Sequence, residues 1–192
     1  MDRKLTFNYL ISTCNMKLGV IFRFAKEFNN IKVYQTLYCS LIRQKLEYCC
    51  MVWSPQYITH MDRIEAIQKK FLRRVLQHFP WKDPVRLPPY EHRLNLLEMS
   101  TLKKRRNVLS IVFVCKVLNG DVFSPCILKL LSLKVPSIIL RNFTILRYDI
   151  RTNYNYLKFE PTNVMINLFN ENYSSIDFNL SYDRIKHKLL RN

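Results

Sequence analysis

Glycine is scarce in this 192-residue chain, which contains only two. An average protein has glycine at about 7% of its positions. The shortage argues against turn-rich β architectures and against the glycine-rich loops that cradle phosphates. The sequence therefore predicts an all-α fold.

The residue groupings that catalytic and metal sites need are also missing. No two aspartates are adjacent, whereas two-metal phosphoryl transfer needs clustered carboxylates. The six cysteines show no CxxC spacing, and the four histidines do not lie at metal-ligand spacing from them. We therefore predict no catalytic residue, metal or cofactor in this chain, and buried reduced thiols in place of a disulfide framework.

Long hydrophobic runs are absent as well. The longest one, Val108 to Cys115, contains Ser110 and stops at Lys116, far short of the roughly 20 residues that a membrane span requires. Polar residues interrupt the N-terminal segment, which argues against a signal peptide. We expect an intracellular protein, cytoplasmic or nuclear, that does not enter a membrane.

Positive charge is what the chain has in excess. Lysine and arginine number 31 against 14 aspartates and glutamates, for a net charge of +17. The excess is uneven, since residues 1–106 hold 20 of the basic and 8 of the acidic residues. Such a charge favours a polyanionic partner, meaning RNA, DNA or an anionic membrane, and it places the partner-facing surface mainly in the first part of the chain.

Helical periodicity organises the first 80 residues. Apolar residues at steps of three and four predict one helix from about residue 7 to Asn29-Asn30, a second from Tyr34 to Trp53, with Leu41 and Cys49 on its core face, and a third from Thr59 to Phe79. Ser54-Pro55 separates the last two helices. The connections are short, so we predict an antiparallel three-helix unit over residues 1–80.

The third of these helices carries a basic stripe opposite its apolar face. The stripe is formed by Arg63, Lys70, Arg74 and Gln77, with Arg73 beside it, and Lys69 is the fifth candidate cation of this helix. The stripe extends over about 16 Å at about 1.5 Å per residue, which is long enough to follow several backbone phosphates. Glu65 can pair with Lys69 at a spacing of four. The alternative interpretation is a solvated helix face with no ligand.

A second basic cluster comprises Lys103, Lys104, Arg105 and Arg106. It falls in the first turns of a predicted helix over residues 100–118, where positive charge opposes the helix dipole. Neutralisation by phosphate would explain this placement, and a solvated surface run is the alternative. From Val108 to Leu118 the helix is apolar nearly all round, and Asn119-Gly120 supplies its C-cap.

Three segments follow from these patterns. The three-helix unit at 1–80 is followed by a proline-rich linker with basic and buried helices at 81–120, and then by a C-terminal region at 121–192. In the last segment we predict helices from Pro125 to Leu133 and in the tail, with irregular structure over residues 137–160. The whole forms a helical bundle, a second helical layer and a partly irregular tail.

Several blocks of the sequence, in order, resemble a known family. They are TLYCSLIRQKLEYCCMVWSPQYITHMDRIEAIQKKFLRRVL, YEHRLNLLEMSTLKKRR and VPSIILRNF with RTNYNYLKFEPTNVMINLFN. Together they resemble the region after the palm in reverse transcriptases of jockey-type non-LTR retrotransposons of insects. The resemblance implies a thumb that packs against the template-primer duplex, so that the partner is RNA or an RNA-DNA hybrid backbone. It maps the family's basic helix onto Lys69, Lys70, Arg73 and Arg74, and its later basic run onto Arg105 and Arg106.

The resemblance implies no polymerase activity for this chain alone, because the paired aspartates of that family's catalytic motif are missing. The leading hypothesis is a nucleic-acid-binding remnant of a reverse transcriptase that lacks the catalytic palm. Part of a complete RNA-directed DNA polymerase, a helical protein-interaction domain without an enzymatic role, and a product with no selected function are the alternatives.

Overall fold

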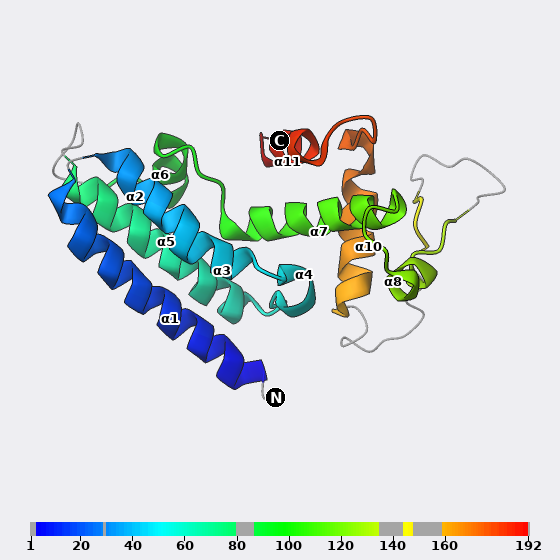
Figure 1. The fold of residues 1–192 in the computed structure, drawn as a ribbon, viewed down its shortest axis with the longest axis horizontal. Coiled ribbons are helices and arrows are strands. Elements are labelled where there is room, and N and C mark those ends of the chain that lie inside the picture. Colours follow the sequence, from blue (N-terminus) through cyan, green and yellow to red (C-terminus); the bar gives the residue numbers. More distant parts are fainter. Residues whose placement is uncertain (1–2, 29, 80–86, 135–143, 148–158, 192) are drawn as a thin grey trace. The chain divides into compact units, whose positions relative to one another are not determined.

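The computed structural model describes residues 3–28, 30–79, 87–134, 144–147 and 159–191 (Figure 1). Over these ranges the regular secondary structure is helical, apart from one isolated antiparallel bridge between Leu133 and Leu146. The predicted all-α fold is confirmed. No helix within these ranges combines the length and the apolar character that a membrane crossing requires. Residues 81–86, at the start of the predicted linker segment at 81–120, and most of the predicted irregular segment at 137–160 lie outside the described residues.

The chain divides into two compact units. The first consists of Met1–Tyr48 and Pro55–Lys103, and the second of Cys49–Ser54 and Lys104–Asn192. This division differs from the three consecutive segments that the sequence suggests, because residues 87–103 join the first unit and the helix from residue 104 onward joins the second.

The first unit contains four main helical segments. The first is helix α1 (Arg3–Phe24), which continues into a short 3-10 turn, η1 (Ala25–Glu27). The second combines α2 (Ile31–Tyr38), the π-helical η2 (Cys39–Arg43) and α3 (Gln44–Glu47). The third and fourth are α5 (Ile58–His78) and α6 (Tyr90–Leu96). The two segments α1 and α2–α3 run antiparallel, and both contact α5 (Figure 1).

The segment from α2 to α3 keeps one buried face by widening its helix. Four residues follow each other at intervals of four and are each exposed by 1% or less: Tyr34, Tyr38, Ile42 and Leu46. An α-helix has 3.6 residues per turn, so a strict interval of four drifts around its surface. The π-helical turn at Cys39–Arg43 has wider i→i+5 bonds, and it returns these four side chains to one face.

The predicted helix from Tyr34 to Trp53 is interrupted. Cys49 adopts the left-handed conformation (φ 49°, ψ 28°), and the short helix α4 (Cys50–Trp53) starts after it. The expectation that Leu41 and Cys49 face the core is wrong, because both side chains are exposed. The break at Cys49 and the π-helical turn shift the register on which that expectation was based.

Aromatic packing forms the core of the first unit. The Phe71 ring of α5 stacks on Tyr38 with a centroid distance of 4.2 Å and an interplanar angle of 16°. The ring centroid of Phe22 on α1 lies 6.2 Å from that of Phe71 and 6.0 Å from that of Tyr34. Stacked and tilted rings of this kind stabilise a core beyond the area that they bury.

A buried glutamine ties the helices of the first unit together. Gln68 is fully buried, and its Oε1 accepts a hydrogen bond from the Tyr38 hydroxyl at 3.1 Å. Its Nε2 donates to the Tyr90 hydroxyl at 3.2 Å and to the Ser100 carbonyl at 3.0 Å. A buried amide is costly unless it is satisfied in this way.

Glu65 extends this network to the start of α7 (Leu102–Leu118). One carboxylate oxygen accepts hydrogen bonds from the Tyr90 hydroxyl and from the Leu102 backbone nitrogen, the latter at 3.2 Å. The sequence predicts that Glu65 pairs with Lys69, and the structure differs, because the carboxylate has turned toward α6 and α7. Its negative charge stabilises the positive end of the α7 dipole.

This network predicts sensitivity to alkali. Burial, followed by the nearby Tyr90 and Glu65, holds the pKa of Tyr38 well above its ordinary value of 10.0. The unfolded chain therefore releases this proton first as the pH rises, so the stabilisation is complete below pH 10 and is lost above it. We expect the free energy of unfolding to fall by about 1.4 kcal/mol per pH unit above that point on account of Tyr38.

The measurement is urea unfolding at a series of pH values for the wild type and Tyr38→Phe. The variant should be less stable at neutral pH, because it loses a hydrogen bond, and should show a shallower decline above pH 10. Tyr9→Phe, at a tyrosine that is 73% exposed, is the matched control. Equal alkaline slopes for Tyr38→Phe and the wild type would contradict the assignment.

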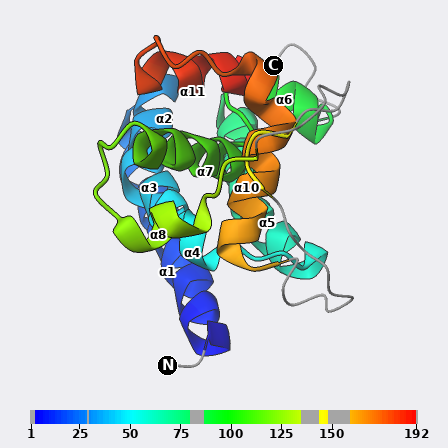
Figure 2. The ribbon, with the colours of Figure 1, turned by 90° about the vertical axis from the view of Figure 1, so that its right-hand side faces the viewer.

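The second unit is built around α7. Figure 2 looks along this helix and shows α10 (Pro161–Asn172), α11 (Tyr182–Arg191) and α8 (Pro125–Leu130) around it. The short turn η3 (Tyr173–Ser175) follows α10. The predicted helix from Pro125 to Leu133 ends early, at Leu130, and the predicted tail helices are confirmed.

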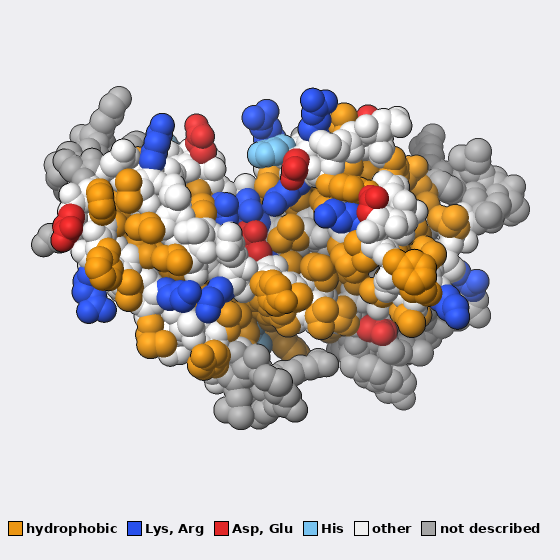
Figure 3. All heavy atoms as spheres, viewed as in Figure 1, with side chains coloured by type: hydrophobic (Ala, Val, Ile, Leu, Met, Phe, Trp, Pro, Cys, Tyr) orange, Lys and Arg blue, Asp and Glu red, His pale blue; other side chains and the backbone are white. Residues whose placement is uncertain are grey.

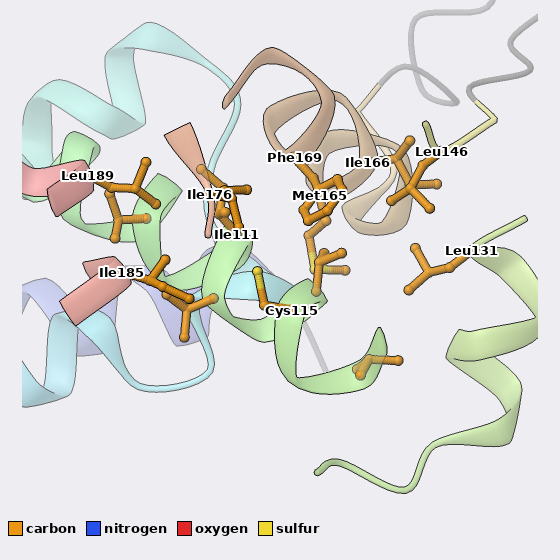
Figure 4. Packing of buried hydrophobic residues seen from close by; sticks show 14 residues of the cluster. Ile111, Cys115, Leu131, Leu146, Met165, Ile166, Phe169, Ile176, Ile185 and Leu189 are labelled. Atoms are coloured by element: carbon orange, nitrogen blue, oxygen red, sulfur yellow. The ribbon is translucent and has the colours of Figure 1, made fainter. Parts of the chain in front are cut away.

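The core of the second unit lies between α7, α10 and α11 (Figure 4). Cys115 of α7 and Phe169 of α10 are fully buried, and Ile185 and Leu189 of α11 complete the cluster at 2% and 5% exposure. The α7 helix ends as the sequence predicts. Gly120 has a φ of 80°, and the amides of residues 120 and 121 donate to the carbonyls of residues 117 and 116, which is a Schellman motif.

The cysteines are free thiols. Cys14 and Cys115 are buried as predicted, Cys50 is buried as well, Cys39 is half-buried, and Cys49 and Cys126 are exposed. Burial raises the pKa of the Cys115 thiol to about 11 and also raises that of Cys14. These two thiols therefore stay protonated, which suits a packing role.

Candidate nucleic-acid interface

The candidate interface is the polar face of α5. Its five cations are all exposed, whereas the apolar residues from Ile64 to Leu76 on the other side of the helix are mostly buried. We call them together the α5 basic face, consisting of Arg63, Lys69, Lys70, Arg73 and Arg74. At about 100° per residue they fall within one sector of the helix surface. Asp62 is the exposed acidic residue in the same sector.

One edge of the α5 basic face borders α1, whose side chains hold the cations in place. The Arg63 guanidinium lies 5.3 Å from the Phe7 ring centroid and donates to Asn8 Oδ1 at 2.9 Å. Lys70 Nζ donates to Asn15 Oδ1 at 3.3 Å. Each contact leaves further nitrogen donors of the cation available to a ligand.

Arg74 completes this edge. Its guanidinium lies 5.1 Å from the centroid of the Phe22 ring. The α1 partners Asn8, Asn15 and Phe22 are spaced seven residues apart and therefore lie on one side of that helix. These partners were not predicted from the sequence, although the matching intervals of seven between Asn8 and Asn15 and between Arg63 and Lys70 are a usable signal.

The opposite edge of the α5 basic face borders α6. Lys69 Nζ lies 5.2 Å from the Tyr90 ring centroid, and the Arg93 guanidinium lies 5.8 Å from the same centroid. Burial and the hydrogen bond to Glu65 raise the pKa of Tyr90 well above its ordinary value. Tyr90 thus stays neutral at physiological pH and contributes no charge that would offset the two cations beside it.

Within the part of the chain that the structure describes, the cations of the α5 basic face have no close acidic partner. Among the described residues, no carboxylate oxygen lies within 4.0 Å of a charged nitrogen of Arg63, Lys69, Lys70, Arg73 or Arg74. By contrast, Arg43 pairs with Glu47 on α3 at 3.8 Å. The positive charge of this face is therefore not neutralised by the described part of the protein and remains available to an anion.

The second predicted cluster is divided by the structure. Lys103 is exposed and belongs to the first unit, whereas Lys104, Arg105 and Arg106 belong to the second. Lys104 and Arg105 are half-buried and make contacts within the protein, as does Arg106. The nine predicted cations are therefore divided between the two units, with Lys103 and the α5 basic face in the first and residues 104–106 in the second.

Arg106 differs most from the prediction. Its side chain is 2% exposed, so it does not present an open surface to a polyanion. Leu102 and Ser110, four residues before and after it, are also buried, which shows that Arg106 lies on the inner side of α7. Glu65 also accepts a hydrogen bond from the Leu102 amide, so the first turn of α7, where the sequence places four cations and suggests a phosphate partner, already has an internal negative charge.

Comparisons with models of known families, with characterised proteins and with solved structures find no match for this chain. Among the described residues, no group of three histidines, cysteines, aspartates or glutamates is placed to hold a metal ion. The geometry of the α5 basic face is therefore the main basis for a functional assignment.

Proposed function

We propose that the first unit binds the sugar-phosphate backbone of a nucleic acid through the α5 basic face. The observation that carries the proposal is the gathering of five exposed cations on one helix, with no described carboxylate within 4.0 Å of them. Arg63 and Arg74 are 11 residues apart, about 16 Å along the helix, so several phosphates of one strand fit beside it.

Contacts to α1 should let this face bind phosphates more tightly than a row of unrestrained side chains would. A lysine or arginine loses up to about 2 kcal/mol of rotamer entropy when it becomes fixed. Phe7, Asn15 and Phe22 already restrict Arg63, Lys70 and Arg74 in the unbound protein. Part of the ordering cost therefore falls on folding, and binding needs less reorganisation.

The resemblance to the thumb of jockey-type reverse transcriptases supports the same assignment. It suggests RNA or an RNA-DNA hybrid as the partner, and four of the five cations correspond to the basic helix of that family. Phosphate contacts position a nucleic acid without reading its bases. We thus propose a nucleic-acid-binding remnant that holds a template-primer backbone without sequence preference and does not itself catalyse polymerisation.

The test is the salt dependence of binding to a labelled RNA-DNA hybrid, measured by fluorescence anisotropy. Five neutralised phosphates predict a slope of about −4.5 in a plot of log K against log salt concentration. Double-stranded RNA, double-stranded DNA and single-stranded RNA of the same length would rank the polyanions. An absence of binding at about 50 mM salt, or a slope near zero, would overturn the proposal.

An exposed apolar stripe on α1 favours a second candidate, a helical protein-interaction domain. Tyr9, Met16, Val20 and Phe24 are 73%, 62%, 39% and 68% exposed, and their spacing places them along one side of α1. Apolar side chains are visible along this helix in Figure 3. A protein partner held by this stripe would bind with an affinity that barely changes with salt, which distinguishes the two functions.

A further inference from the structure

The last helix carries a second basic surface that the sequence analysis did not single out. We call it the α11 basic face, consisting of Arg184, His187, Lys188 and Arg191, all exposed. These positions follow the helical intervals of three, four and seven, so the side chains form one stripe about 10 Å long. Figure 3 shows lysine and arginine side chains with a histidine gathered over α11.

The stripe is not neutralised from within the described protein. No described carboxylate oxygen lies within 4.0 Å of the charged nitrogens of Arg184, Lys188 or Arg191. Asp183 lies in the first turn of the helix, to one side of the stripe. Lys188 and Arg191 are in the last turn, where the dipole favours cations, but Arg184 is in the first turn, where the dipole does not explain it.

The other face of α11 is committed to the protein core. Ile185 and Leu189 are 2% and 5% exposed within the cluster that contains Phe169. A basic amphipathic helix binds a membrane by inserting its apolar face among the lipids. Because that face is already buried, α11 offers charge alone to a partner, which favours a phosphate backbone over a lipid surface.

Contacts at its N-terminus hold α11 against the end of α7. The Tyr182 hydroxyl donates to the Asp121 carboxylate and accepts from Asn119 Nδ2 at 2.9 Å. Lys116 Nζ lies 5.2 Å from the Tyr182 ring centroid. The hydrogen bond to Asp121 is the main reason that the pKa of Tyr182 is raised. The nearby acid Asp121 is thereby engaged with Tyr182, and the helix is fixed at its first residue.

We propose that the α11 basic face is a separate binding site for nucleic-acid phosphates on the second unit. This proposal takes from the proposed function only the class of ligand, a nucleic acid. The site itself is independent, because the α11 basic face belongs to a different unit from the α5 basic face. Arg184 and Lys188 lie one helical turn apart in the stripe and, together with Arg191, donate charge-assisted hydrogen bonds to backbone phosphates.

The experiment compares two double variants of the full chain. Arg184→Gln/Lys188→Gln neutralises the α11 basic face, and Lys129→Gln/Lys134→Gln removes the same charge from exposed positions elsewhere in the second unit. Both are measured for RNA-DNA hybrid binding in the wild type and in a chain with a neutralised α5 basic face. The α11 variant should lower the steepness of the salt slope by about 1.8 and weaken binding by about 10- to 100-fold at about 0.1 M salt.

Each outcome decides the proposal separately from the proposed function. If the α11 variant matches the Lys129/Lys134 control in both backgrounds, the second site does not exist, whereas the first is judged by the α5 variants alone. Retained binding by the charge-preserving Arg184→Lys/Lys188→Arg chain would support phosphate contacts and would verify that substitutions here leave the fold intact. If the α11 variant loses only its binding to phosphatidylserine vesicles, the surface is a membrane site and the proposal is wrong.

Discussion

Neutralising the α5 basic face along its α1 edge is expected to weaken RNA-DNA hybrid binding by about two to three orders of magnitude at about 0.1 M salt. The variant is Arg63→Gln/Lys70→Gln/Arg74→Gln. The affinity falls because three phosphate contacts, and the counterion release that accompanies them, are lost. The same loss makes the log-log salt slope less steep by about 2.7. The reduction should be similar for different base sequences, because phosphate contacts do not discriminate among them.

The fold should survive these changes. The three residues are exposed, and glutamine retains hydrogen-bonding capacity toward Asn8 and Asn15. The cation-π contacts with Phe7 and Phe22 are at exposed sites, where each is worth about 0.5–1 kcal/mol. Far-UV circular dichroism and urea unfolding of the variant therefore provide a direct check that lost binding reflects lost charge.

A matched control removes the same charge from other exposed positions of the first unit. Arg23→Gln/Lys32→Gln/Lys45→Gln lowers the net charge by three without touching α5. We expect it to change affinity far less than the α5 variant, through the long-range field alone. Equal losses in the two variants would mean that net charge and not a localised site determines binding, and the α5 basic face would no longer be a site.

The sequence predicts the helices well where their periodicity is regular. The pattern over α5 and over α7 keeps close to 3.6 residues per turn, and both helices are observed within a few residues of their predicted bounds. The intervals of four from Tyr34 to Leu46 look equally helical on paper. They require a π-helical turn, and the left-handed Cys49 then ends the segment, because tertiary packing decides between such nearly equal local conformations.

The candidate site divides in the same way. Which cations share a face of α5 follows from helix geometry alone, so their common exposure was predictable. The burial of polar residues inside the core could not be predicted from helix geometry. Gln68 is buried because Tyr38, Tyr90 and the Ser100 carbonyl satisfy it, and these groups come from three other parts of the chain. The burial of Arg106 likewise depends on what surrounds α7 and not on its own sequence neighbours.

Replacing Phe71 with alanine should destabilise the first unit by about 3–5 kcal/mol, the usual cost of removing a buried phenylalanine. The side chain has no exposed surface, and its ring stacks on Tyr38 at 4.2 Å. The loss combines buried apolar area, the stacking contact and the cavity that remains between α5 and its neighbours. Urea unfolding followed by far-UV circular dichroism measures the change.

Because each unit has its own core, Phe71→Ala should also separate their transitions. The first unit should unfold at a lower urea concentration, while Trp53, which belongs to the second unit, should report a later change in fluorescence in a chain whose other tryptophan, Trp81, is replaced by phenylalanine. Phe24→Ala, at a position that is 68% exposed on α1, should change stability by less than about 0.5 kcal/mol. If Phe71→Ala changed the free energy of unfolding as little as Phe24→Ala, the assignment of a stacked aromatic core beneath the α5 basic face would be wrong. Phe22, which contacts both Phe71 and Arg74, would then no longer link the core to the cations.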